Sequence, residues 1–151
     1  MTVNIDITKE LKAVEKLIKS DINKEKTILG LYNYIFKSDG KKIRSRLNLI
    51  ASSSSKNSHR YKLASIIELL HTATLVHDDV VDNASTRRGA VSVNSLWSNA
   101  HGVLIGDYIY SKAFMLMVEI GKKDILAELA DATNDISQGE LIQLDAISNI
   151  K

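Results

Sequence analysis

The sequence predicts an all-α protein. None of its 151 residues is proline, so the commonest interior helix breaker is absent. Apolar residues recur at spacings of three and four along stretches long enough for whole helices. With 44% hydrophobic and 25% charged residues, the chain is long enough for one compact domain with a core and too short for two large ones. We therefore expect a single helical domain over residues 1–151.

The first half of the chain divides at its polar and turn-forming residues. Apolar spacing predicts helices over residues 7–19 and 23–36, and the turn residues at 38–40 end the second of them. A third helix begins near Lys41, with apolar residues at turn spacing. It gives way to the serine-rich run at residues 52–60, which we interpret as an exposed loop.

The second half begins with the most apolar helix, predicted over residues 61–81. Apolar side chains surround it on most sides, so we expect other helices to pack around it. The polar segment at residues 83–92 has loop composition. Further helices are predicted over residues 93–99, 102–120 and 124–146.

Composition and charge exclude several classes of protein. The absence of cysteine excludes disulfides and thiolate metal sites. Twenty basic residues against eighteen acidic ones give a formal net charge of +2, too balanced to favour nucleic acid as the main partner. No apolar run approaches the roughly 20 residues of a membrane span, and the start of the chain lacks the features of a signal peptide. We expect a cytoplasmic protein that does not span a membrane.

Residues 71–88 crowd three aspartates, two histidines and two arginines around the end of the fourth predicted helix. Asp78, Asp79 and Asp82 fall within about one third of the helix circumference. Like charges so placed are tolerated in water or beside a cation. The arginine pair at 87–88 carries guanidinium groups that suit phosphate oxygens. The leading hypothesis is a site for a divalent metal and a phosphate ester.

The helical register sharpens this hypothesis. His71, Thr74, Asp78 and Asp82 step by three or four residues and form one stripe. The rise from Asp78 to Asp82 is about 6 Å, which suits two metal ions bridged by a diphosphate better than one chelated ion. Magnesium fits, because it prefers few protein carboxylates with water and phosphate as its other ligands. A solvated acidic helix end is the alternative reading, although it opposes the helix dipole.

Four short segments occur in a characteristic order. They are Ser38-Asp39-Gly40-Lys41-Lys42-Ile43-Arg44, Asp78-Asp79-Val80-Val81-Asp82 with Arg87-Arg88 after it, Gly106-Asp107, and Gly139-Glu140-Leu141-Ile142-Gln143-Leu144. They resemble the GGKxxRP segment, the first aspartate-rich motif with its double arginine, the GD pair and the GExxQL segment of the trans-type polyprenyl diphosphate synthases, of the octaprenyl or long-chain kind. Four motifs in order are far more specific than one. The resemblance implies an antiparallel helical bundle, the N-terminal half of the isoprenoid synthase fold.

The resemblance also implies an activity, because enzymes of this family join isopentenyl diphosphate to an allylic diphosphate with the help of Mg²⁺. Asp78 and Asp82 would hold the magnesium ions that bind the allylic diphosphate, and Asp79 would support them. Arg87 would reach the same diphosphate. The isopentenyl diphosphate would be bound by Lys41, Arg44, His71 and Arg88. His77 lies off the stripe, so we expect it to pack.

Two departures from the family pattern affect these expectations. Asp39 replaces a glycine and Ser45 replaces a proline, so backbone geometry at the isopentenyl diphosphate site is expected to differ. Ala73 and Thr74 lie where members with short products often have bulky aromatic residues. Small side chains there would leave the chain-length pocket open and imply a medium or long polyprenyl product.

Length is the largest departure. Family members are roughly twice as long, and their second half carries a second aspartate-rich motif that completes the metal site. We therefore predict that this chain alone is inactive or nearly so, as a cloned segment, a proteolytic fragment, a truncated gene product or one half of a split enzyme. Its expected partners are a separate C-terminal half or a second copy, since the family forms dimers.

Two other classes of function stay open. A metal-dependent phosphohydrolase could use His77 and Asp78 as an HD pair, but His71 and His77 lie on opposed faces of the helix. A non-catalytic subunit that regulates an active synthase would also be helical. The full set of charged residues counts against it, because a scaffold has no need of them.

Overall fold

The computed structural model describes residues 6–37 and 40–149 of the chain, and it confirms the all-α prediction. The helices of these residues are α1 (Ile7–Ile18), α2 (Lys26–Ile35), α3 (Ile43–Ala51), α4 (His59–Val81), α5 (Val93–Leu96), α6 (Asn99–Ile120) and α7 (Lys123–Asn149). Between α4 and α5 lies a small antiparallel hairpin of β1 (Thr86–Arg87) and β2 (Ala90–Val91), which the sequence does not predict. No helix of the described residues is long and apolar enough to cross a membrane.

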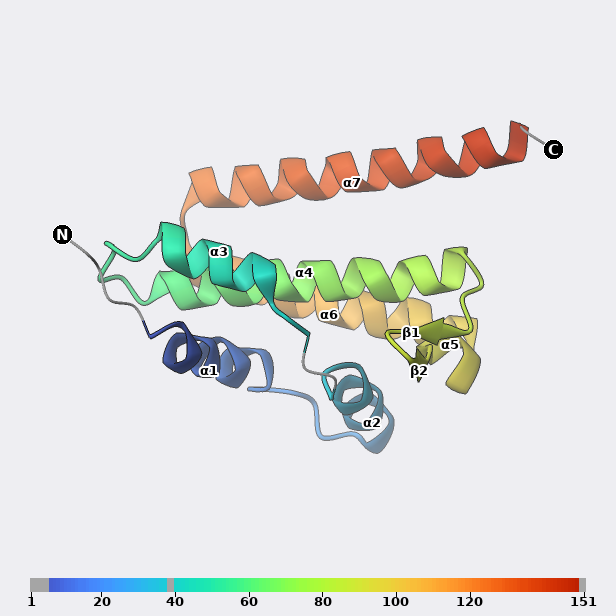
Figure 1. The fold of residues 1–151 in the computed structure, drawn as a ribbon, viewed down its shortest axis with the longest axis horizontal. Coiled ribbons are helices and arrows are strands. Elements are labelled where there is room, and N and C mark those ends of the chain that lie inside the picture. The colour runs from blue at the N-terminus through green and yellow to red at the C-terminus, as the bar shows by residue number, and fades with distance from the viewer. Residues whose placement is uncertain (1–5, 38–39, 150–151) are drawn as a thin grey trace. The chain divides into compact units, whose positions relative to one another are not determined.

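Helices α4 and α6 form the centre of the fold and run antiparallel to each other (Figure 1). The buried side of α4 includes Leu69 and Ala73, and that of α6 includes Ile109 and Ala113, all fully buried. The α6 side is lined by small residues that let the helices approach closely. A Cβ on Gly102, for example, would lie 2.6 Å from a methyl carbon of Val80. Close packing of this pair sets the direction of the acidic end of α4.

Helices α1 and α3 pack on α4, and α2 contacts α6. In α1, Leu11, Val14 and Ile18 are buried at helical spacing, and the Asp6 carboxylate caps the helix by accepting a hydrogen bond from the Lys9 N–H at 3.1 Å. Both α1 and α3 contact α4. The hydroxyl of Ser45, which is fully buried, donates to the Ala64 carbonyl at 3.0 Å. The serine found in place of a proline thus ties α3 to α4.

The chain divides into two compact units, the first ending at Ile120 and the second beginning at Gly121. Gly121, the residue after α6, has a left-handed φ of 64°, which glycine adopts without strain at the end of a helix. The second unit consists of α7, which carries the Gly139–Leu144 segment. The single domain expected from the sequence stays a prediction.

Candidate functional site

The acidic end of α4 has the register that the sequence predicts. The helix runs unbroken to Val81, and the Asp82 N–H donates to the Asp78 carbonyl at 2.8 Å. Asp78 and Asp82 therefore lie one turn apart on one face, in line with His71. Asp82 is exposed and Asp78 is half-buried. Two carboxylates that water can reach thus share this face.

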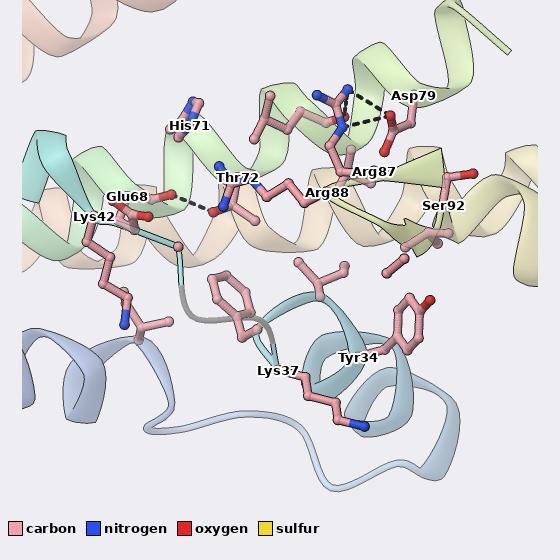
Figure 2. A pocket seen from close by; sticks show the side chains of 18 of the residues that line it. Tyr34, Lys37, Lys42, Glu68, His71, Thr72, Asp79, Arg87, Arg88 and Ser92 are labelled. Atoms are coloured by element: carbon pink, nitrogen blue, oxygen red, sulfur yellow. Dashed lines mark hydrogen bonds and ion pairs between the residues drawn. The ribbon is translucent and has the colours of Figure 1, made fainter. Parts of the chain in front are cut away.

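Asp79 has a different environment from its two neighbours in the motif. Its side chain is only 7% exposed and is paired with Arg87. The Nε and Nη2 atoms of Arg87 lie 2.9 and 2.7 Å from the Asp79 Oδ1 atom, and Nη2 also donates to the Leu75 carbonyl at 3.4 Å. Figure 2 shows this pair beside the hairpin. The hydrogen bond with Asp79 raises the pKa of Arg87 above its ordinary value, despite partial burial.

His71 lies among cationic groups. Its Nε2 atom is 3.0 Å from the Arg44 Nη1 atom, and because a guanidinium only donates, Nε2 accepts and the ring is neutral in this arrangement. Burial is the main cause that lowers the pKa of His71, and the charges of Arg44, Arg88 and Arg87 lower it further. A neutral imidazole surrounded by arginines is suited to take up a proton when an anion binds.

A cavity of about 400 Å³ opens beside this histidine. Its lining comes from the start of α3, from α4 and from the hairpin, and consists of Gly40, Lys41, Lys42, Ile43, Arg44, Glu68, His71 and Arg88. The four residues expected to bind isopentenyl diphosphate all belong to this lining. The structure thus brings together side chains that lie up to 47 positions apart in the sequence. The sequence analysis gave no ligand role to the other lining residues, which are Gly40, Lys42, Ile43 and Glu68.

Two unusual backbone conformations shape this cavity. Lys42 (φ 46°) immediately precedes α3 and Arg88 (φ 52°) begins the turn of the hairpin, both in the left-handed region. Gly40 lets the Arg88 side chain approach, since a Cβ there would lie 2.5 Å from its Nη1 atom. Ser38 and Asp39, the other expected turn residues, lie outside the described residues.

A second cavity of about 420 Å³ lies next to the first, between α2, α4 and the hairpin (Figure 2). It shares Lys42, His71 and Arg88 with the first cavity. Apolar side chains such as Phe36 and Leu75 form much of its wall. The cationic groups therefore stand between a polar cavity and a more apolar one.

Ala73 and Thr74, the expected chain-length residues, line neither cavity. Ala73 is fully buried. Thr74 is half-buried, and its hydroxyl donates to the His71 carbonyl at 2.8 Å. Thr74 lies on the same face of α4 as Asp78, away from the face that carries Asp79.

His77 packs, as expected, and it packs on α6. Its Nε2 atom lies 3.1 Å from the Val103 carbonyl oxygen and 3.3 Å from Asp107 Oδ1. Its ring stacks on Tyr110 with centroids 5.7 Å apart. The face of α6 that carries the Gly106–Asp107 pair therefore meets α4 next to Asp78, a juxtaposition that spacing alone did not show.

The acidic and histidine side chains near the motif indicate how a metal ion could be bound. No group of three or more histidine and acidic side chains in the described part of the chain is close enough to hold a metal ion by itself. Asp79 pairs with Arg87, and Asp78 and Asp82 are the two carboxylates of the motif that share a face. Two carboxylates with room for water and phosphate oxygens fit a hard divalent ion that arrives with its substrate.

Comparisons with known proteins show which family this chain resembles. The polyprenyl synthetase family model matches residues 6–151. The chain is 36% identical over 146 residues to the octaprenyl diphosphate synthase of Escherichia coli (strain K12), covering 94% of this chain and 45% of that protein. It is 35% identical over 144 residues to the all-trans-nonaprenyl-diphosphate synthase (geranyl-diphosphate specific) of Rhodobacter capsulatus, covering 93% of this chain and 44% of the relative.

Solved structures show the same similarity in three dimensions. The polyprenyl synthase from Caulobacter crescentus CB15, complexed with calcium and isoprenyl diphosphate, superposes with a TM-score of 0.87 at 36% identity, covering 91% of this chain and 43% of that one. The isoprenoid synthase fold implied by the motifs is therefore confirmed. The chain spans less than half the length of these relatives. With a family model that matches nearly all of its residues, the chain belongs to the polyprenyl synthetase family.

Proposed function

We propose that this chain forms one wall of the active site of a prenyltransferase that condenses isopentenyl diphosphate with an allylic diphosphate. The observation that carries the proposal is the arrangement along α4, where Asp78 and Asp82 lie on one face and His71, two turns earlier, lines a cavity with Arg44 and Arg88. One end suits a metal-bound diphosphate and the other suits a second, metal-free diphosphate.

Mg²⁺ is the proposed ion, held by Asp78 and Asp82. When bound, it would neutralise the diphosphate leaving group as the carbon–oxygen bond of the allylic substrate breaks. The residues of this chain contribute binding and orientation, because two anionic substrates must be held close together in one geometry. Arg87 would add a guanidinium next to the allylic diphosphate while Asp79 holds it in place.

The isopentenyl diphosphate would occupy the cavity lined by Lys41, Arg44, His71 and Arg88. Its charge would favour a protonated His71, which then donates to a phosphate oxygen instead of accepting from Arg44. Attack of the isopentenyl double bond on the allylic carbon, followed by loss of a proton to the released diphosphate, would complete the condensation without a covalent enzyme intermediate.

The relatives with nonaprenyl, octaprenyl and decaprenyl products support a medium-chain or long-chain polyprenyl product. Ala73 and Thr74 are the proposed chain-length residues of this chain. In a protein that supplies the region matching the other half of the relatives, Ala73→Phe should shorten the product. Unchanged product length with Ala73→Phe and Thr74→Phe would contradict this assignment.

Binding measurements with the 151-residue chain test the proposal. We expect isopentenyl diphosphate to bind without metal and geranyl diphosphate, as a probe for allylic diphosphates, to bind only with Mg²⁺. Arg44→Gln should weaken the first and Asp82→Asn the second, which makes each variant the control for the other. We expect no turnover by the chain alone, so rapid condensation by the pure monomer would contradict the one-wall proposal.

A second candidate is a non-catalytic helical partner that regulates an active synthase. Co-expression with a polypeptide that matches the other half of the relatives separates the two. Restored condensation supports a catalytic wall, whereas binding without restored activity supports a regulator. Association as a homodimer and a cytoplasmic location are further parts of the proposal, testable by light scattering and by fractionation.

A further inference from the structure

His77 immediately precedes the aspartate-rich motif, but its side chain contacts α6. Its Nε2 atom lies within reach of two acceptors on α6, the Val103 carbonyl oxygen at 3.1 Å and the Asp107 carboxylate at 3.3 Å. Because both groups only accept hydrogen bonds, Nε2 carries the proton. The ring of Tyr110, also on α6, stacks on the imidazole at an interplanar angle of 29°.

Gly106 makes this contact possible. It is buried, and a Cβ built on it would lie 2.2 Å from the Nε2 atom and 2.4 Å from the Cδ2 atom of the His77 ring. The imidazole therefore lies directly on the α6 backbone. One turn earlier on α6, Gly102 receives Val80 in the same way. Two glycines of α6 thus hold two residues from the last turns of α4, His77 and Val80.

This contact determines where the motif points. Successive residues of a helix differ by about 100° around its axis, so turning His77 away from Gly106 would turn Asp78 and Asp82 by the same angle. We infer that His77 is a positioning residue. Its contact with Gly106 and Asp107 fixes the rotation of the last turns of α4. This rotation directs the carboxylates of Asp78 and Asp82 toward the metal and the allylic diphosphate. The inference rests on the proposed function for the identity of that ligand.

The same geometry divides the roles of the Gly106–Asp107 pair. The glycine provides the space for the imidazole, and the aspartate, which is exposed with 61% of its side chain accessible, provides one of the acceptors. Partial burial raises the pKa of Tyr110, and the charges of Asp78 and Asp107 raise it further. The cluster of His77, Asp107 and Tyr110 therefore adjoins Asp78 directly.

Substitutions at His77 and Gly106 separate positioning from packing. His77→Gln keeps an N–H donor for the α6 acceptors, whereas His77→Phe keeps a ring on Tyr110 and loses the donor. Gly30→Ala is the matched control for glycine substitutions, because no atom lies within 4 Å of a Cβ at that position. The readouts are Mg²⁺-dependent binding of geranyl diphosphate and metal-free binding of isopentenyl diphosphate, each measured by calorimetry, together with thermal unfolding.

We expect His77→Phe to weaken geranyl diphosphate binding by about 10-fold to 100-fold, the usual effect of losing a group that orients a metal ligand. Isopentenyl diphosphate binding should not change, and His77→Gln should retain most of the affinity for geranyl diphosphate. Gly106→Ala should weaken geranyl diphosphate binding in the wild-type background and have a much smaller effect in a His77→Ala background. Gly30→Ala should bind both ligands normally.

The outcomes distinguish the inference from the proposed function. If the wild-type chain shows no Mg²⁺-dependent binding of geranyl diphosphate, the proposed function is refuted, and the positioning role falls with it. If the wild-type chain binds and His77→Phe binds equally well, or loses both ligands equally, only the positioning role is overturned. Additive effects of Gly106→Ala and His77→Ala would overturn it as well.

Discussion

Removing the Arg87 guanidinium should destabilise the fold more than removing the carboxylate that it contacts. The two partners are unequally buried, since the Asp79 side chain is 7% exposed and the Arg87 side chain is 37% exposed. Arg87→Ala leaves an ionised carboxylate in a buried position, which typically costs about 3–5 kcal/mol. Asp79→Ala leaves a guanidinium that water and the Leu75 carbonyl still reach, so we expect about 1.5–3 kcal/mol.

The assay is urea unfolding at neutral pH, followed by the fluorescence of Trp97. This is the only tryptophan of the chain, and its ring lies 5.2 Å from that of Tyr34, so it reports on the unit that contains the pair. Asp79→Asn keeps an oxygen acceptor and should lose less stability than Asp79→Ala. The double variant Asp79→Ala/Arg87→Ala should lose clearly less than the sum of the single variants.

Two results would refute this reasoning. One is an Asp79→Ala variant that is as unstable as Arg87→Ala, which would mean that burial of the carboxylate does not decide the cost. The other is strict additivity in the double variant, which would mean that the two groups do not interact in solution. A difference of 1 kcal/mol corresponds to about 2–4 °C in Tm for a chain of this size, so thermal unfolding provides an independent check.

Three further predictions follow from other contacts. Burial and the surrounding arginines lower the pKa of His71. The contribution of His71 to stability should therefore be constant above about pH 6.5 and fall as the pH drops through the lowered pKa, because unfolding then takes up a proton. In urea unfolding across pH, His71→Gln should lose this pH-dependent contribution. Gly40→Ala would displace the flexible end of Arg88, so calorimetry should give about tenfold weaker isopentenyl diphosphate binding, about 1.4 kcal/mol, and unfolding should show little loss of stability. Arg60→Ala breaks a bidentate pair with Glu10, at 2.7 and 2.6 Å, between side chains that are 8% and 17% exposed. Urea unfolding should show that stability falls by about 3 kcal/mol, and ligand binding in calorimetry should be unchanged.

The helices were largely predictable, because apolar periodicity is a local property of the sequence. Their starts were less so. Helix α2 begins at Lys26 rather than at residue 23, because the carboxylate of Glu25 caps it by accepting from the Thr27 and Ile28 N–H groups at 2.8 and 3.1 Å. Glutamate is an unusual cap, so composition does not indicate it.

The hairpin could not be predicted from local pattern. Strands of two residues show no alternation of apolar and polar side chains. Contacts from elsewhere hold it instead, including the Tyr34 hydroxyl, which donates to the Val91 carbonyl at 2.8 Å, and the Asp79–Arg87 pair. Both contacts join the hairpin to another element of the fold, so the local sequence pattern of the hairpin does not indicate them.

In the candidate site, too, features set within one helix were predictable and contacts between helices were not. The shared face of His71, Asp78 and Asp82 follows from helical periodicity, because all of them lie on α4. The contact between Arg44 and His71 joins residues 27 positions apart, so its geometry depends on how α3 packs on α4. The functional roles of these residues stay predictions until binding is measured.

The last turns of α4 explain why adjacent residues of one motif differ so much in environment. Each step of about 100° directs a side chain to a different neighbour, so that His77 meets α6, Asp78 lies on the stripe, and Asp79 meets the hairpin arginine. Asp82 returns to the stripe one turn later. Deletion of a single residue before His77 would shift each of these residues into its neighbour's environment and place the Asp78 carboxylate on Gly106, beside the Asp107 carboxylate that His77 now contacts. The motif therefore depends on the packing of α4 between α6 and the hairpin as much as on its own aspartates.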